Sequence, residues 1–280
     1  MGLRLSTNMS AVVGQRHLRQ AKQLVDKSAE RLASGYKFNK AADNPMGYSV
    51  SEKMRERMKG LMQAQLNISD GISLLQVAEG GALEIQNILI RLQELAIQSA
   101  SSTYNTEQRG YLNNEFQSLR DEVDRIAKST EFNGKFLLDG TGGQVNLQVN
   151  VGGHNLVGVD HIGFNLSELW MNSDRLNIEK ADILSVKTAQ NSIALLEKAI
   201  TQTTQMRGLV GSIENRLGST ANIISSSLEN LSLSSSRIKD TDFAKETAEY
   251  SQNSIMLEAG MSLMTQTNNI QRIALELLKS

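Results

Sequence analysis

The chain has 280 residues, of which 29 are basic, 30 are acidic and none is cysteine, so it is nearly neutral and lacks disulfides and thiolate metal sites. Neither sign of charge forms a long block, which argues against a nucleic-acid surface, and no run of about 18 apolar residues is present to insert into a membrane. A single proline and an aromatic content of 4% favour long helices packed in thin bundles.

The first predicted element is an amphipathic helix over residues 5–32. Its apolar side chains recur at steps of three and four residues, and Asn8 is the expected N-cap. A break follows between Ser34 and Gly47, where glycine, asparagine, aspartate and the only proline gather within a short span. The chain is therefore predicted to turn or hinge there.

Two helices are predicted between this break and the middle of the chain. Over residues 46–99 apolar side chains recur every seven residues, which is typical of a helix that packs along its whole length. A second helix opens at Asn105, where Gln108 completes a capping-box pattern. The core residues predicted from these two helices are Leu75, Leu89, Leu92, Phe116 and Leu119.

The middle of the chain changes in composition, with eight glycines between Asn133 and Leu166. Apolar side chains alternate on either side of Gly152 and Gly153, which predicts a β-hairpin near residues 141–170 with a loop on either side. The alternating residues are Leu147, Val149 and Val151 before the two glycines and Val157, Val159, Ile162 and Phe164 after them. This hairpin would reverse the chain ahead of the longest helix.

The longest predicted helix covers residues 177–238. From Ala189 to Ile238 one position in every seven is apolar, apart from Thr203, and no proline interrupts the series. At 1.5 Å per residue this helix would be about 90 Å long, so it needs partner helices of similar length, which the two earlier helices can supply. The core residues predicted from it are Leu196, Val210, Leu217 and Ile224.

The last predicted helix starts at the acid-rich residues 240–242, which suit a helix N-terminus. The first and last segments, residues 1–43 and 241–280, are each about 40 residues long and weakly apolar, and neither has an evident partner in the rest of the chain. Burying a leucine or methionine stabilises by about 1.5–3 kcal/mol, whereas ordering each residue costs about 1.5 kcal/mol, so two such helices alone come close to zero. We therefore expect other molecules to order both termini.

Several blocks, spread in order over nearly the whole chain, resemble those of the bacterial flagellins. The matching blocks are RLASGY at residues 31–36, DGISL at residues 70–74, AEG at residues 78–80, ELAIQSA at residues 94–100, EFNG at residues 131–134 and DFAKE at residues 242–246. The resemblance implies a mainly α fold: a long antiparallel helical rod with a small β-hairpin at its midpoint, plus a paired N- and C-terminal helix domain. It is similar to a minimal flagellin, without the outer domains that larger members insert at the midpoint.

The resemblance also implies a division of the chain and the residues that pair its ends. Residues 1–43 and 241–280 correspond to the terminal helices that line the central channel of a filament, and residues 44–240 correspond to the rod. Within these terminal segments, the residues expected in helix pairing or in contacts between subunits are Val12, Leu18, Val25, Leu32, Phe243, Tyr250, Leu257, Met264 and Leu278.

The function implied by the resemblance is that of a structural subunit, which polymerises with copies of itself into the filament used for motility. Such proteins leave the cell unfolded through the flagellar export apparatus, which implies an extracellular location without a cleaved signal peptide. Further partners implied are other flagellins, the flagellar cap, junction proteins, an export chaperone and the vertebrate innate receptor for flagellin. The nearest alternative is a hook-filament junction protein, which shares the terminal helices and the inner rod.

Arg91, Glu94 and Gln98 repeat at helical spacing and therefore share one helix face. A solvated stripe is the simplest interpretation. In the flagellins, however, the similar positions form a patch that the innate receptor recognises and that packs between subunits, so a filament-contact role is also expected.

The sequence predicts no catalytic, metal or cofactor site. The three histidines, His17, His154 and His161, stand in no pattern typical of a nucleophilic triad or a metal centre. The alternative from another functional class is a secreted enzyme or receptor-binding effector on a helical scaffold, for which the chain offers no catalytic constellation.

Overall fold

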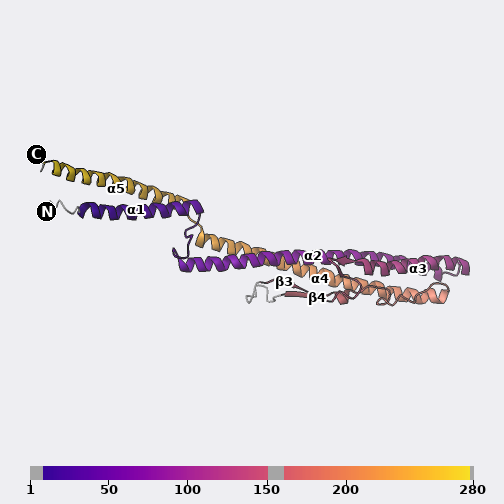
Figure 1. The fold of residues 1–280 in the computed structure, drawn as a ribbon. Coiled ribbons are helices and arrows are strands. Elements are labelled where there is room, and N and C mark those ends of the chain that lie inside the picture. The colour runs from indigo at the N-terminus through magenta and orange to yellow at the C-terminus, as the bar shows by residue number, and fades with distance from the viewer. Residues whose placement is uncertain (1–8, 151–160, 278–280) are drawn as a thin grey trace. The chain divides into compact units, whose positions relative to one another are not determined.

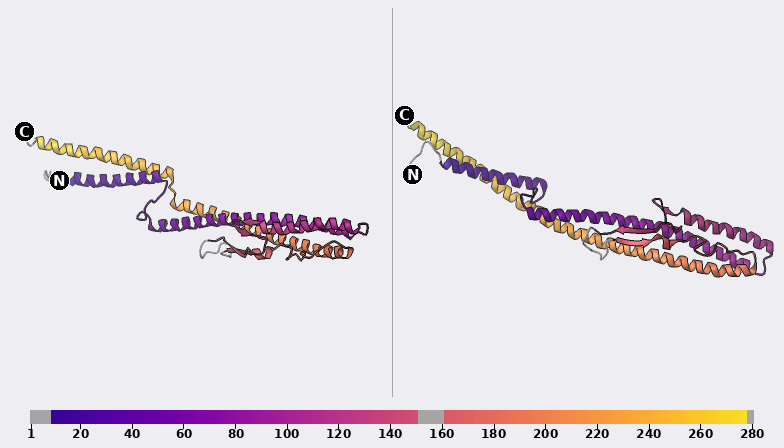
Figure 2. Two further views of the ribbon diagram at one scale, coloured as in Figure 1. Left: turned by 45° about the vertical axis from the view of Figure 1, so that its right-hand side comes forward. Right: turned by 60° about the horizontal axis from the view of Figure 1, so that its bottom comes forward.

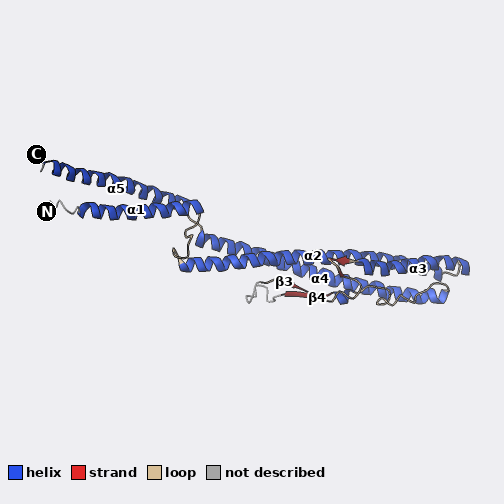
Figure 3. Ribbon diagram, in the orientation of Figure 1, coloured by secondary structure: helices blue, strands red, loops and turns tan. Residues whose placement is uncertain are grey.

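The computed structural model describes residues 9–150 and 161–277 (Figure 1). Its contacts divide the chain into two compact units, one made of Met1–Glu56 and Asn230–Ser280 and the other of Arg57–Glu229. Figure 3 shows that helices dominate both units and that the strands are short. The predicted mainly α fold is therefore confirmed. Within the described residues no helix combines the length and the hydropathy needed to span a membrane.

Three long helices build the Arg57–Glu229 unit: α2 (Pro45–Ala100), α3 (Thr106–Ser129) and α4 (Val186–Lys239), of which α2 and α4 also extend into the other unit. The apolar face of α2 is buried at seven-residue steps, and α4 presents a matching series of buried residues. Of the core residues expected from the sequence, Leu119 is half-buried. Those with at most 1% of their surface exposed are Leu75, Leu89, Leu92, Phe116, Leu196, Val210, Leu217 and Ile224.

Polar contacts link α2 and α4 in antiparallel register within this unit. Gln76 donates to Glu214 over 3.2 Å, and about one turn further along α2 Glu79 forms an ion pair with Arg207 over 2.7 Å. Arg207 also donates to Gln86. Because both charges of the Arg207–Glu79 pair are about 70% covered by protein, this pair favours one register of the two helices over a slipped one.

Helix α3 begins as its sequence predicts. The side-chain oxygen of Asn105 accepts from the backbone N–H of Gln108 at 2.8 Å, and the Gln108 side chain accepts in return from the Asn105 backbone at 3.0 Å. These two bonds satisfy N–H groups that have no partner inside a helix. The predicted capping box is confirmed.

Two antiparallel hairpins follow α3. In the larger one β3 (Gln144–Gln148) pairs with β4 (His161–Asn165), which places Leu147 opposite Ile162 as the predicted alternation requires. Val149 is buried but follows the end of β3, and the residues expected at the tip, Val151, Gly152, Gly153, Val157 and Val159, lie outside the described residues.

The smaller hairpin, β1 (Glu131–Phe132) and β2 (Lys135–Phe136), was not predicted. Its turn is made by Asn133 and Gly134, both with positive φ, at 50° and 75°. Asn-Gly is the preferred pair for a two-residue turn of this hand. The local signal was therefore present, but the two-residue strands are too short to show an alternation.

The prediction that the longest helix starts at residue 177 is wrong. Helix α4 begins at Val186, after a 3-10 helix η1 (Leu166–Leu169) and an irregular segment, residues 170–185. Asn177 has a φ of 55°, which a helix does not allow. The helix start is set instead by Ser185 and Thr188, whose hydroxyls accept from each other's backbone N–H at 3.1 and 3.0 Å.

Side chains of α3 hold the irregular segment in place. Asp124 accepts from both the backbone N–H and the hydroxyl of Ser173 at 2.7 Å, and Arg120 donates to the carbonyl of Glu179 at 2.7 Å. Leu176 and Ile178 of the segment are at most 1% exposed. Burial of these apolar side chains, together with hydrogen bonds that replace helical ones, explains why the segment is not helical.

Gly71 allows the larger hairpin to lie against α2. A Cβ atom at Gly71 would stand 2.2 Å from the Leu147 side chain of β3, and Asn67, one turn earlier, donates to the carbonyl of Gln148 at 3.0 Å. Only glycine leaves room for this close approach.

We expect Gly71→Leu to displace the hairpin and to destabilise the chain by about 1–3 kcal/mol, as overpacking does. Limited proteolysis should then cut near residues 144–165 faster than in the parent chain. Gly80→Leu on the same helix is the matched control, because a Cβ at Gly80 meets no atom within 4 Å. Equal proteolysis of the two variants would show that Gly71 does not position the hairpin.

Candidate functional site

Helices α1 (Met9–Ser34) and α5 (Phe243–Leu277) lie side by side and antiparallel, and we call them the terminal pair (Figure 2). On each helix the covered positions recur at steps of three and four, which is the spacing of a coiled-coil seam. The seam positions are Ala11, Gly14, Leu18, Ala21, Val25, Ser28 and Leu32 of α1, and Glu246, Tyr250, Asn253, Leu257, Gly260, Met264 and Thr267 of α5.

The residues expected from the sequence to pair the termini fall into three groups. Val12 and Phe243 are 56% and 58% exposed and point away from the seam, although the Phe243 ring approaches Gly35. Leu278 and the expected cap Asn8 lie outside the described residues. The six residues placed in the seam are Leu18, Val25, Leu32, Tyr250, Leu257 and Met264.

The connections that leave the terminal pair are bonded to each other. Tyr36 and Asp240 form an antiparallel bridge, flanked by the bonds from Lys37 N–H to the Lys239 carbonyl at 2.7 Å and from Thr241 N–H to the Gly35 carbonyl at 2.8 Å. The Lys239 ammonium lies 4.3 Å from the centre of the Tyr36 ring. The end of α1 and the start of α5 are thus held together where the two helices meet the connections.

Each helix of the terminal pair also has its end defined locally. Gly35, with a φ of 75°, ends α1 and donates to the carbonyl of Arg31 at 2.8 Å. Asp242 caps α5 by accepting from the backbone N–H of Ala244 at 3.0 Å. The acid-rich start predicted for the last helix is confirmed in this cap.

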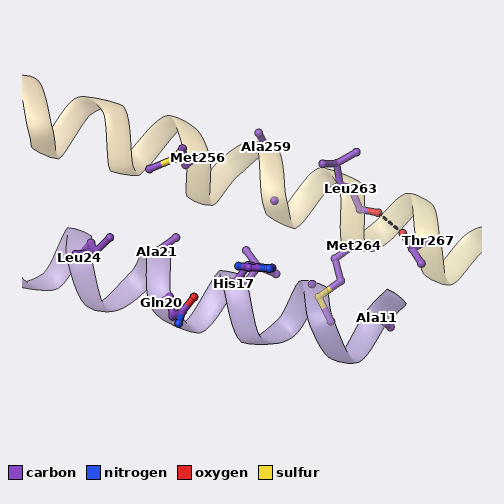
Figure 4. Close-up of a pocket in the computed structure, with 13 residues that line it drawn as sticks. Ala11, His17, Gln20, Ala21, Leu24, Met256, Ala259, Leu263, Met264 and Thr267 are labelled. Atoms are coloured by element: carbon purple, nitrogen blue, oxygen red, sulfur yellow. Dashed lines mark hydrogen bonds between the residues drawn. The ribbon is translucent and has the colours of Figure 1, made fainter. Parts of the chain in front are cut away.

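Large apolar side chains remain uncovered on the terminal pair. On α5, Ile255 is 66% exposed, Leu263 64% and Ile270 58%. Leu263 also lines a groove of about 530 Å³ between the two helices. Figure 4 shows this groove, with Met264 reaching from α5 toward α1 and His17 at its edge. A series of exposed apolar side chains of this extent marks a surface that other molecules cover.

A second surface, which we call the rod patch, consists of Arg91, Glu94 and Gln98 on the exposed side of α2. Arg91 donates to Glu115 of α3 at 2.9 Å and to Glu94 at 3.0 Å, and the bond to Glu115, then that to Glu94, raises the pKa of the Arg91 guanidinium. Gln98 donates to the hydroxyl of Tyr104 at 2.9 Å. No pattern in the sequence joins Glu115 or Tyr104 to this patch, because both lie beyond the turn that ends α2.

The described residues contain no group of three or more acidic, histidine or cysteine side chains placed to hold a metal ion. His17 is exposed on α1 and His161 is exposed at the start of β4, while His154 lies outside the described residues. The two described histidines are therefore on different elements and in different units.

Two helices of the rod, α2 and α4, are more than 50 residues long, and the terminal pair leaves apolar side chains uncovered. These features define the class of the protein: a structural subunit of a larger helical assembly. The family model described as the bacterial flagellin N-terminal helical region matches residues 5–142, and that described as the bacterial flagellin C-terminal helical region matches residues 193–278. The chain belongs to the bacterial flagellin family. Its function is that of a structural subunit of the flagellar filament.

Individual relatives agree with this assignment. A flagellin of Halalkalibacterium halodurans is 34% identical over 275 residues, which cover 98% of this chain and 99% of the relative. The crystal structure of Bacillus cereus flagellin has a TM-score of 0.50 and 30% identity to this chain, and the match covers 56% of this chain and 88% of the other. Flagellins are structural proteins rather than enzymes.

A protein described as a flagellar hook-associated protein from Vibrio parahaemolyticus has a TM-score of 0.57, covering 71% of this chain and 100% of the other. Its identity is 15%, so this likeness concerns the fold alone. The full-length similarity to flagellins thus favours a filament subunit, and nothing favours the hook-filament junction protein.

Proposed function

We propose that the terminal pair carries the main contacts between copies of this chain in the filament. The observation behind this proposal is the exposed apolar series on α5, which includes Ile255, Leu263 and Ile270, beside the groove shared with α1. A helix face of this kind is covered when an apolar face of a similar helix packs against it. When such contacts join copies head to tail and the rotation between them closes no ring, they produce a filament of indefinite length.

The same surface has a consequence for the subunit before assembly. A pair of helices that covers only one seam gains little free energy over the unfolded chain, so order in the terminal pair is coupled to binding of further copies. A subunit with weakly ordered ends stays unassembled until a growing filament offers the missing contacts. This fits an extracellular subunit that is exported unfolded, without a cleaved signal peptide, and that meets a chaperone, a cap and junction proteins on its way.

The experiment that tests this function is negative-stain electron microscopy of the purified chain after seeding or salt-induced assembly. Long, uniform, hollow filaments are the expected result. Monomers that persist under every condition, with a folded rod and unordered termini, would contradict assembly of this chain by itself.

The rod patch is our proposed second contact between copies. Arg91→Glu reverses a charge that is held between Glu94 and Glu115, so it should slow filament growth and leave the melting temperature of the monomer nearly unchanged, because exposed ion pairs contribute little to stability. Elongation rates from seeded light scattering measure the first effect and circular dichroism the second. Activation of the vertebrate innate receptor for flagellin by soluble monomer is expected to fall in the same variant.

Arg125→Glu is the matched control for Arg91→Glu. Arg125 is an exposed α3 arginine with an ion pair to Glu122 at 2.5 Å, three residues away on the same helix. If both variants elongate at the same reduced rate, the effect comes from net charge and the rod patch is not a contact.

A further inference from the structure

Two contacts along the terminal pair define a single register for its helices. A Cβ atom at Gly260 of α5 would stand 3.0 Å from Leu18 of α1, so the leucine fills the space that the glycine leaves. Almost four turns further toward the connections, Arg31 of α1 forms an ion pair with Glu246 of α5 over 3.6 Å. In an antiparallel pair the residue numbers of facing positions add to a nearly constant sum. The sum is 278 for the first contact and 277 for the second, so both contacts belong to the same register.

This register places a small residue opposite a large one in four layers of the seam, those of Gly14, Leu18, Ala21 and Ser28. Leu18 faces Gly260, and in the register that this contact defines Ala21 faces Leu257. Gly14 likewise faces Met264 and Ser28 faces Tyr250, while Val25 and Asn253, which are closer in size, meet between them; all of these residues are half-buried or buried. Gly14, Ala21 and Ser28 thus form the smaller row of α1, beside its larger row with Leu18 and Val25, and Tyr250, Leu257 and Met264 form the larger row of α5. Side chains of unequal size let two helices approach closely.

A slip of three or four residues would break this pattern. It would place the larger row of α1, with Leu18 and Val25, against the larger row of α5, with Tyr250 and Leu257. Large residues would then meet large ones, and small residues would face voids, both of which cost free energy. The two rows thus exclude the half-heptad slips.

A slip of a whole heptad keeps small rows against large ones, so a second device must exclude it. In the two heptad slips Leu18 would face Asn253 or Thr267, each of which carries a side chain where Gly260 has none. Either slip also removes Arg31 from Glu246, whose surface is only 7% exposed. A carboxylate covered to that extent needs its cation.

We propose that Leu18 with Gly260, assisted by Arg31 with Glu246, selects the register in which the chain's own N- and C-terminal helices pair. The register decides which exposed residues of α1 and α5 line up along the groove between them. These are positioning residues for the terminal pair. The inference concerns contacts within one chain and does not rest on the proposed contacts between copies.

Cysteine cross-linking tests the register, because the chain has no cysteine of its own. Ala21→Cys with Leu257→Cys places two thiols in the same layer and should form a disulfide within one chain under mild oxidation. Ala21→Cys with Tyr250→Cys, and Ala21→Cys with Met264→Cys, are the controls, each one heptad away. A heptad corresponds to about 10 Å along a helix, beyond the reach of a disulfide. Gel mobility separates bonds within a chain from bonds between chains, in dissociated subunits and in filaments.

The second test fills the space at Gly260 that Leu18 occupies. Gly260→Leu should reduce disulfide formation by Ala21→Cys with Leu257→Cys about tenfold, as expected when a packed site is overfilled. Adding Leu18→Ala should restore it, since the sizes are then exchanged between the helices. Gly14→Ala, where a Cβ meets nothing within 4 Å, should leave the rate unchanged.

Each outcome decides the register. Cross-linking that is as fast at a control pair, or that is absent from the Ala21 and Leu257 pair in both subunits and filaments, overturns the assignment. A Gly260→Leu variant that cross-links at the parent rate overturns the role of the Leu18–Gly260 contact. So does a Gly260→Leu variant whose cross-linking rate is not restored by Leu18→Ala. Loss of filaments with cross-linking retained concerns contacts between copies and leaves the register standing.

Discussion

Deletion of residues 240–280 is expected to abolish filament growth while residues 57–229 remain helical. The deletion removes α5, and with it both the partner of α1 and the exposed side chains Ile255, Leu263 and Ile270. The rod keeps its core because the apolar faces of α2, α3 and α4 are buried within the Arg57–Glu229 unit, which the deletion leaves in place. Electron microscopy scores the filaments, and circular dichroism with thermal melting scores the rod.

A less drastic variant separates the two roles of α5. Ile255→Ser with Leu263→Ser and Ile270→Ser removes exposed apolar surface and leaves the seam residues Leu257, Gly260 and Met264 in place. This triple variant should also fail to polymerise. Normal filaments from the deletion would contradict a terminal contact of any kind, and normal filaments from the triple variant would limit the role of α5 to pairing with α1.

Leu217→Asp should unfold the rod or lower its melting temperature by about 10 °C or more. Leu217 has no exposed surface, and an ionised carboxylate placed there has no cation within the apolar seam of α4. A buried, unpaired charge ranks among the most destabilising point changes, at about 4 kcal/mol or more, and each kcal/mol lowers the melting temperature of a chain of this size by roughly 2–4 °C. Thermal melting of the monomer by circular dichroism measures the effect.

Leu233→Asp is the control for Leu217→Asp, since it makes the same chemical change at a residue of α4 that is 53% exposed. Exposed substitutions usually change stability by about 0.5 kcal/mol or less, so its melting temperature should match that of the parent chain. An unchanged melting temperature in Leu217→Asp would show that the seam is misassigned.

Repeating patterns and local caps were readable from the sequence. The seven-residue spacing of Leu75, Leu89, Leu196 and Leu217 identified the long helices, because a helix that buries one face along its length must repeat its apolar side chains at that interval. The capping box at Asn105 and the acidic start near Asp242 were equally readable, since a helix end is satisfied by residues within one turn of it.

Only the tertiary structure decided the path of residues 170–185. Their apolar residues repeat with no helical or strand period, and Leu176 and Ile178 become buried only because the chain folds back onto the rod. The bonds that replace helical ones come from Asp124 and Arg120, some 50 residues earlier in the chain. Interactions of that range leave no local signal, so the sequence pattern extended the helix too far toward its N-terminus.

The terminal pair shows the same division. The sequence by itself determined that both ends are amphipathic and only weakly apolar, because composition and spacing govern both properties. Which side chains meet, Leu18 with Gly260 and Arg31 with Glu246, was decided by the tertiary structure. Heptad patterns specify a face of a helix, whereas the partner and the register depend on the fit of side chains from distant parts of the chain.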